Sequence, residues 1–278
     1  MAGVTCTLST MAAAETPDVA VPTLGECHSE VPEGGLSTTV QPGETVRLSL
    51  ISARFSNMDH GRHGTAGDPV ERAKAAWVEA NASAVTLFSS HVAAMDELNV
   101  PGIEVEGNFE LARVVNSSMY ALLGAYRNDS RYSSAPEGLV STRYSGHAFW
   151  DVETWQWPTW LVFWPDQASA ALQYRVDLMD QAARNTAHLS VWLHDFTPGS
   201  PIDQFEPKHL EGLRFPWESA LAGIEQCSPS DENHVVGDIA LAFRQYWRAT
   251  HNVTWLKTSG FPVIEGIARY YSTFGSDP

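Results

Sequence analysis

The chain has few cysteines and little positive charge, and both shortages argue against whole classes of protein. Its three cysteines, Cys6, Cys27 and Cys227, are odd in number and far apart, so neither a disulfide framework nor a CxxC metal or redox site can be drawn from them. The 17 Lys and Arg stand against 33 Asp and Glu, which gives a formal net charge of −16. Such a surface repels phosphate backbones and anionic lipids, so we expect neither nucleic acid nor a membrane as a partner.

We also expect neither a targeting sequence nor a membrane-spanning one. No apolar stretch approaches the roughly 20 residues that a membrane-spanning helix needs. The first basic residue is Arg47, so the N-terminus has no basic n-region, and we expect no signal or transit peptide. These observations leave the compartment open.

Motifs of several cofactor-dependent and metal-dependent classes are missing as well. No GxSxG elbow, Walker A loop, GxGxxG fingerprint or Cys–His nucleophile pair can be assembled, and we expect no cofactor. His147, Asp151 and Glu153 are close in sequence, as are His60 and His63, but neither spacing matches a zinc or calcium pattern. We therefore expect no metal site.

Tryptophan, by contrast, is abundant. The chain has 10 Trp among 278 residues, and half of them lie between Trp150 and Trp164. The content of 44% hydrophobic and 18% charged residues is typical of a globular protein. Indole rings suit both cores and the recognition of sugar rings, so the Trp-rich segment is a candidate binding region.

The pattern of residues divides the chain into four parts. Residues 1–35 lack periodicity and predict a loosely ordered lead-in. Residues 36–65 alternate in polarity after a QPGE turn at Gln41–Glu44, which predicts a β-hairpin from a sheet. Residues 66–105 predict a helical linker, and residues 106–278 a succession of helices.

Apolar residues at helical spacing locate these helices. One connecting helix is expected from Val70 to about Leu98, and later helices are expected around stripes that begin near Leu111, Pro165, Val235 and Val263. A β element followed by helices with unusual residues in their connecting loops is the outline of an α/α barrel with a β module in front. Function is then expected in the loops.

The segment Gly138–Pro158 is the first candidate binding loop. Aromatic faces beside carboxylates suit a pyranose, because its C–H faces stack on rings while its hydroxyls donate to carboxylate oxygens. The alternative is that its tryptophans are core residues at the start of a helix. The side chains concerned are His147, Trp150, Asp151, Glu153 and Trp155.

Two later loops repeat the pairing of rings and carboxylates. FPWESALAGIE contains Trp217 and Glu218, although Glu218 could instead be a solvated helix-cap residue. SDENHVVGD contains Glu232 and His234 directly before an apolar helix. There the alternative is that Asp231 and Glu232 serve the positive end of the helix dipole.

Three segments together resemble glycoside hydrolase family 65. They are GHAFWDVETWQWP, FPWESALAGIE and ENHVVGDIALAFRQYW, in this order. The resemblance extends over Leu36 to Phe274, since EVEGNFELARVVNSSMYALLGAYRND is similar to the first barrel helix and QPGETVRLSLISARFSN to the last strands of the N-terminal β-sandwich. It implies a mainly α fold, with part of an (α/α)6 barrel over residues 106–278, a β-sandwich remnant over 36–65 and a helical linker over 66–105.

The resemblance also implies roles for individual residues. Trp150 and Asp151 match the family's pair that holds glucose in the subsite where the bond is cut, and Trp217, Glu218 and Glu232 match positions that line the same pocket. The FPWES segment is more similar to members that act on glucosyl-galactosyl-hydroxylysine of collagen-type peptides, because trehalases and phosphorylases tend toward FPWxT. We therefore expect a glucoside or disaccharide as the substrate.

Members of this family invert the anomeric configuration, with a protonated Glu as general acid and either activated water or phosphate as nucleophile. That Glu lies in a later segment resembling GPDEY, which does not occur before Pro278, so we expect the general acid beyond Pro278 and an incomplete barrel here. The connecting helix also departs from the family's HxxxW pattern, since Met95 follows His91. The expected activity is hydrolysis of an α-glucoside; the alternatives are a non-catalytic glucoside-binding fragment, an acid trehalase or a disaccharide phosphorylase.

Overall fold

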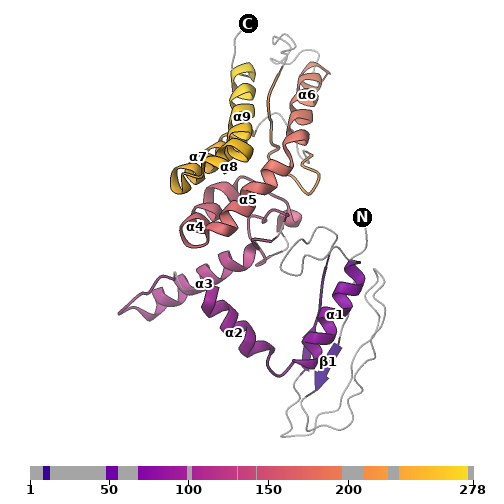
Figure 1. Cartoon of the computed structure of the whole chain (residues 1–278), viewed down its shortest axis with the longest axis vertical. Coiled ribbons are helices and arrows are strands. Elements are labelled where there is room, and N and C mark those ends of the chain that lie inside the picture. The colour runs from indigo at the N-terminus through magenta and orange to yellow at the C-terminus, as the bar shows by residue number, and fades with distance from the viewer. Residues whose placement is uncertain are drawn as a thin grey trace. The chain divides into compact units, whose positions relative to one another are not determined.

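The structure is a computed structural model, and it is mainly helical, which confirms the predicted class (Figure 1). The chain is divided into two compact units, Met1–Pro101 and Gly102–Pro278. None of the helices in the described parts of the chain is long and apolar enough to cross a membrane. The structure describes residues 9–12, 48–55, 68–98, 102–129, 131–141, 143–195, 210–224 and 232–274.

The first unit contains a two-stranded antiparallel ladder. Strand β1 (Ser9–Ala12) pairs with strand β2 (Leu48–Ile51), and Ser9 lies opposite Ile51. Strand β1 lies within residues 1–35, for which the sequence predicted a loosely ordered lead-in, and its partner almost forty residues away gives no local signal. The two strands do not amount to the expected β-sandwich remnant. The predicted turn at Gln41–Glu44 lies outside the described residues, as do His60, His63 and the three cysteines.

The predicted connecting helix is two helices rather than one. Asp68 caps helix α1 (Pro69–Ala82), because its side chain accepts from the Val70 N–H, and helix α2 (Leu87–Leu98) follows after a turn. The turn contains Ser83 and Thr86, whose hydroxyl and backbone groups bond locally and compete with a continuous helix. Of the predicted stripe, Trp77 is buried, whereas Val85 is 91% exposed.

The second unit begins with helix α3 (Phe109–Ala125), which contains the start of the predicted stripe near Leu111. Asn108 caps it, because its side chain accepts from the Leu111 N–H at 3.0 Å. Met119 and Leu123 face the interior. Leu111 and Val114, at the start of the expected apolar stripe, are exposed.

The Trp-rich segment forms helix where the sequence indicated a loop. The short η1 (Arg143–Gly146) is followed by a π-helical turn, η2 (Val152–Gln156), which continues into α4 (Trp157–Phe163). The Trp157 indole donates to the Ala168 carbonyl at 3.0 Å, and the Trp160 indole donates to the Leu122 carbonyl at 2.9 Å. Both rings are fully buried, so these two tryptophans belong to the core, as the alternative reading held.

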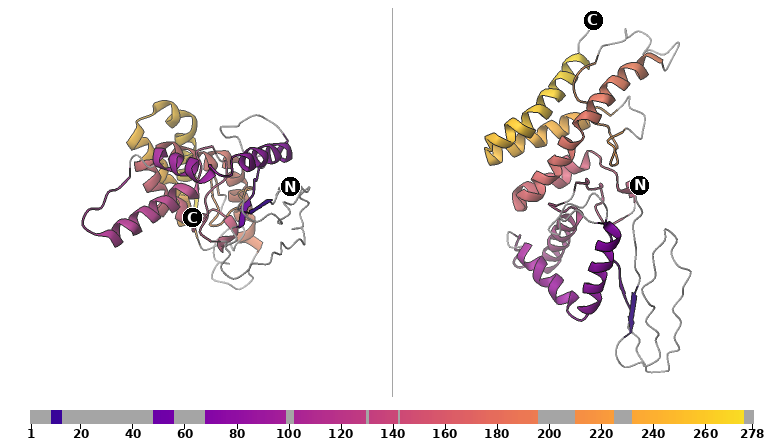
Figure 2. Two further views of the ribbon diagram at one scale, coloured as in Figure 1. Left: turned by 90° about the horizontal axis from the view of Figure 1, so that it is seen from below. Right: turned by 45° about the vertical axis from the view of Figure 1, so that its right-hand side comes forward.

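Further helices make up the remaining described part of the unit. Pro165 opens α5 (Pro165–Asp177) as predicted, and a break at Leu178 separates it from α6 (Met179–Asp195). Helix α7 (His234–Thr250) leads through α8 (Val253–Trp255) and the π-helical η4 (Leu256–Gly260) into α9 (Phe261–Phe274). Figure 2 shows α7 and α9 lying side by side, and their predicted apolar stripes are buried at Val235, Ile239, Phe243, Val263 and Ile267.

Residues 210–216 cross the unit between α6 and α9 in an extended form. The Arg214 N–H donates to the Ala182 carbonyl of α6 at 3.2 Å, and the Leu213 N–H donates to the Gly266 carbonyl of α9 at 2.9 Å. Gly212 has φ +98°, and a Cβ there would lie 2.2 Å from the Gly266 oxygen. The segment therefore needs glycine at this crossing, and it delivers the chain to Trp217 and Glu218.

Candidate functional site

The first and second candidate loops are joined through their backbones. Ala148 and Ser219 form an isolated antiparallel bridge, in which the Ala148 N–H donates to the Ser219 carbonyl at 2.8 Å and the Ser219 N–H returns a bond at 3.1 Å. Tyr144 and Ser145, just before the bridge, adopt the left-handed region with φ 60° and 51°. The bridge brings residues 147–151 beside residues 217–219, although about seventy residues separate them in sequence.

A side-chain contact reinforces this junction. His147 Nδ1 lies 2.7 Å from Glu218 Oε1, and the two side chains are only 23% and 15% exposed. Glu218 lies in a stretch of bends and turns, and no helix among the described residues starts there. Its carboxylate therefore belongs to the junction of two loops, and the solvated helix-cap alternative is wrong.

Aromatic rings line the same junction. Phe149 meets the edge of Trp217 at a centroid distance of 5.2 Å and an angle of 88°, and Tyr144 meets Phe149 at 5.1 Å. Phe149 is buried, and Trp217 is partly exposed. The Trp217 ring is thus held against a buried phenyl group rather than left mobile at the surface.

Trp150 lies between a second aromatic ring and the third loop. Its centroid is 5.7 Å from that of Trp155, which is 63% exposed, and 5.4 Å from that of His234 at an angle of 81°. His234 is the first residue of α7. The first candidate loop therefore contacts the third loop through Trp150. It contacts the second loop through His147 and Ala148.

Glu232 joins this cluster through His234. Glu232 Oε2 lies 2.9 Å from His234 Nε2, and Asp238 Oδ2 lies 2.8 Å from His234 Nδ1. A neutral imidazole has one N–H, so both contacts are hydrogen bonds only when the ring carries two protons or one carboxyl is protonated. Glu232 also directly precedes α7, so its position suits the helix dipole as well as a ligand.

Asp151 stands at the beginning of η2, next to Trp150. It is partly exposed, and its side chain makes no capping bond to the turn that follows. Burial raises the pKa of the Asp151 carboxyl, and a hydrogen bond with its own backbone partly opposes that change. The carboxylate therefore remains available to a ligand.

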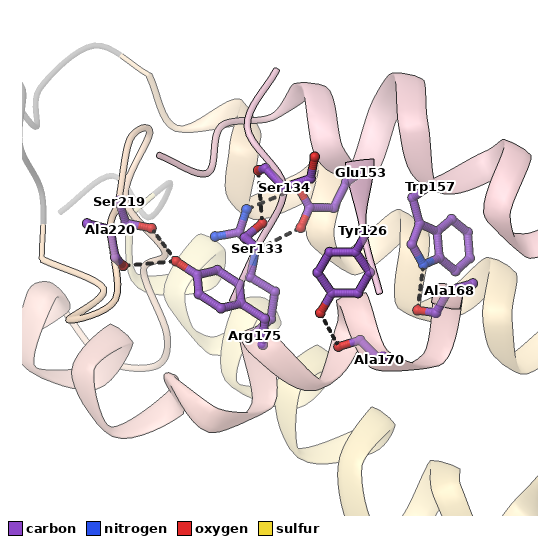
Figure 3. Close-up of polar contacts among 11 residues, drawn as sticks. Tyr126, Ser133, Ser134, Glu153, Trp157, Ala168, Ala170, Arg175, Ser219 and Ala220 are labelled. Atoms are coloured by element: carbon purple, nitrogen blue, oxygen red, sulfur yellow. Dashed lines mark hydrogen bonds and ion pairs between the residues drawn. The ribbon is translucent and has the colours of Figure 1, made fainter. Parts of the chain in front are cut away.

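Glu153 has a different role from its neighbours in the predicted cluster. Arg175 Nε donates to Glu153 Oε1 at 2.7 Å and Arg175 Nη2 to Oε2 at 3.1 Å, with both side chains at most 2% exposed. Figure 3 shows these side chains pointing toward each other in the interior. The expectation that Glu153 belongs with the sugar-facing carboxylates is wrong, because the wider π-helical turn directs it into the core.

Helix α5 supports the second loop through residues that the sequence did not single out. The Tyr174 hydroxyl donates to the Ala220 carbonyl at 3.0 Å and lies 3.1 Å from the Ser219 hydroxyl (Figure 3). The Arg175 guanidinium lies 5.9 Å from the centroid of the Phe215 ring. Neither residue stands in a motif, so only their long-range contacts reveal this function.

The structure brings the five predicted site residues into one region of the second unit. Trp217 and Glu218 meet the first loop at Phe149 and His147, while Glu232 reaches Trp150 through His234. The region combines partly exposed rings with carboxylates, the chemistry that a pyranose requires. Within the described segments, no group of three or more His, Cys, Asp or Glu side chains could hold a metal ion.

Comparisons with known proteins place this region in a family. Residues 117–276 match the glycosyl hydrolase family 65 central catalytic domain. The chain is 33% identical over 243 residues to the protein-glucosylgalactosylhydroxylysine glucosidase of Dictyostelium discoideum, covering 85% of this chain and 31% of that protein. It is 29% identical to the kojibiose hydrolase of Flavobacterium johnsoniae, with 84% of this chain and 32% of that protein covered.

A solved structure shows the same fold. A protein assigned as a kojibiose phosphorylase from human microbiome superposes with a TM-score of 0.65 at 15% identity, over 97% of this chain and 33% of that one. The chain spans about a third of the length of the curated relatives it matches.

Proposed function

The chain belongs to glycosyl hydrolase family 65, and on this premise we propose that its three loops bind the glucosyl unit of an α-glucoside. In this proposal the glucose stacks on Trp150, and Asp151 accepts hydrogen bonds from its hydroxyls. Trp217, Glu218 and Glu232 line the rest of the pocket. The observation that carries the proposal is that Trp150 contacts His234 of the third loop, while Ala148, three residues before Asp151, is bridged to Ser219 of the second loop.

The bound glucoside is of the glucosyl-galactosyl-hydroxylysine type, and its bond is hydrolysed with inversion. Two observations favour this substrate: the FPWES sequence around Trp217, and the relative from Dictyostelium discoideum, whose name refers to this glucoside. In the inverting reaction a carboxylic acid protonates the leaving oxygen while a second carboxylate activates water on the opposite face. The residues above have binding roles, and we assign no general acid among them.

Phosphorolysis is the second candidate, because relatives named kojibiose phosphorylase also match the chain. Both reactions begin with the same bound glucosyl unit and differ in whether water or phosphate attacks. Release of glucose 1-phosphate, as opposed to glucose, in phosphate buffer separates the two reactions.

Calorimetric titration of the chain with glucose and with glucosyl-galactosyl-hydroxylysine tests the binding proposal. We expect saturable heat with both ligands and a loss of at least about tenfold in affinity for Asp151→Asn, because a carboxylate bond is worth about 1.5–3 kcal/mol. Asp180→Asn, an exposed residue in the first turn of α6, is the matched control and keeps the wild-type affinity. The absence of heat with either ligand at millimolar concentration rejects the proposal.

A further inference from the structure

Asn233 lies between two residues of the candidate site and is held by two tyrosines of α9. The Tyr270 hydroxyl donates to Asn233 Oδ1 at 2.6 Å, and the Tyr271 hydroxyl donates to the Asn233 carbonyl at 2.8 Å. One bond fixes the side chain and the other fixes the backbone of the same residue. Since Glu232 and His234 are its direct neighbours, the two bonds also limit the directions in which these side chains leave the chain.

The Asn233 side chain is not used in the way its position would suggest. Asparagine at the N-cap of a helix commonly accepts a bond from a backbone N–H of the first turn. Here Asn233 precedes α7 and makes no side-chain capping bond, while its amide oxygen accepts from Tyr270. The capping group is therefore used for a contact between helices.

The same helix supports the other wall of the site. The Leu213 N–H donates to the Gly266 carbonyl, and the Glu211 N–H donates to Thr273 Oγ1 at 3.1 Å. Gly212 packs so closely that an added Cβ would lie 2.5 Å from the Tyr270 backbone nitrogen. These contacts fix the position of residues 211–213 against α9, and this segment leads directly to Trp217 and Glu218.

We propose that α9 is the common support that sets the spacing between Glu218 and Glu232 around Trp150, and that Tyr270 is its positioning residue. The inference rests on the proposed function, because the spacing matters for a ligand that reaches both carboxylates. Tyr270 touches no ligand itself and acts through Asn233. One turn earlier on the same face of α9, Gly266 performs the equivalent task for the Glu218 loop.

The environment of Tyr270 suits a constant donor. Its side chain is fully buried, and burial raises the pKa of its hydroxyl to about 12, against a smaller opposing effect of Arg214. The hydroxyl consequently keeps its proton at neutral pH. Arg214 belongs to the segment that precedes Trp217, so both walls of the site have a residue near this hydroxyl.

Tyr270→Phe tests the inference, since it removes one oxygen and keeps the buried ring. In the full chain we expect glucose affinity to fall by about three- to tenfold, the equivalent of one lost hydrogen bond. Amide hydrogen exchange in the first turn of α7 is expected to accelerate without any sugar present. Tyr126→Phe is the matched control, because Tyr126 is also buried and loses a bond to the Ala170 carbonyl; it should change neither glucose affinity nor exchange in α7.

Asn233→Ala removes the acceptor of the same hydrogen bond, and we expect the same changes in glucose affinity and amide exchange. This variant replaces Tyr270→Phe in the test if Tyr270→Phe does not fold. Wild-type affinity together with wild-type exchange in either variant overturns the inference. Faster exchange with unchanged affinity also overturns it, since Tyr270 then has only a structural role. A wild-type chain that binds no glucose rejects the proposed function instead, and the exchange comparison still decides whether Tyr270 holds the Glu232 segment.

Discussion

Arg175 binds Glu153, a residue of the first candidate loop, through two parallel hydrogen bonds, and the pair is almost completely removed from solvent. Two residues before Glu153 stands Asp151, and Arg175 also faces the ring of Phe215, which leads to the second loop. An interior ion pair is costly to desolvate, but it fixes geometry because neither partner can leave the other without a large penalty. The pair thus fixes the first candidate loop at Glu153 and contacts the second loop at Phe215.

Glu153→Gln is expected to destabilise the chain strongly. It leaves the buried Arg175 charge without its counter-charge, and breaking such a pair typically costs about 3–5 kcal/mol. Urea unfolding followed by circular dichroism measures the change. Glu110→Gln, which removes a partner of Arg113 in an exposed pair, is the control and should unfold at the wild-type concentration. Equal midpoints for the two variants would contradict a dominant role for the buried pair.

Gly266→Ala is expected to destabilise α9 against the segment before Trp217. A Cβ at this position would lie 2.4 Å from Leu213 Cγ, so either the side chain or the helix must shift, which costs about 1–3 kcal/mol. Thermal unfolding measures the effect. Gly124→Ala in α3 is the matched comparison, because no atom lies within 4 Å of its added Cβ, and it should stabilise by about 0.5–1 kcal/mol. The prediction fails if both substitutions change stability in the same direction.

Trp150→Phe is expected to weaken glucose binding by about tenfold, since the smaller ring offers less surface for stacking and loses contact with His234. Trp247→Phe provides a matched control at the other end of α7, where Trp247 meets His251 in a similar edge-on arrangement. We expect this second variant to bind like the wild type in calorimetric titration. Similar losses in both variants would mean that the effect comes from α7 rather than from the site.

The raised pKa of Tyr270 predicts a loss of stability at alkaline pH. In the unfolded chain its hydroxyl releases a proton near the ordinary value of 10, whereas burial holds the folded pKa at about 12. Between these values the unfolded state binds fewer protons, so the free energy of unfolding falls as pH rises from about 10 to about 12. Tyr270→Phe should flatten this part of the profile, measured relative to each chain's own stability at pH 7. An unchanged slope would show that the hydroxyl is not protected in the folded state.

Local patterns in the sequence predicted the helices that have one clear apolar face. The stripes of α7 and α9 are buried where expected, and Pro165 marks the start of α5. The division between α1 and α2 was missed because Val85 continues the helical spacing, while the local bonds of Ser83 and Thr86 interrupt the helix. Strand β1 was missed because its partner is distant in sequence.

The candidate site was predicted in its composition but only partly in its geometry. Trp150 and Asp151 were found because rings and carboxylates are dense around them, yet the same density included Glu153, whose direction depends on a π-helical turn that periodicity does not reveal. Trp157, at the start of the helix that follows this turn, also lies in the core. Tyr174 and Tyr270 stand in ordinary helical positions, so their contacts with the loops could come only from tertiary packing.

The bridge between Ala148 and Ser219 uses only main-chain atoms, which every residue except proline at the donor position supplies. Substitutions of the neighbouring side chains therefore leave the donors and acceptors of these two bonds in place. The contacts of Trp217 with Phe149 and of Glu218 with His147 are additional to these main-chain bonds. A small backbone ladder in a mainly helical protein thus gives the two loops a connection that does not depend on the identity of their side chains.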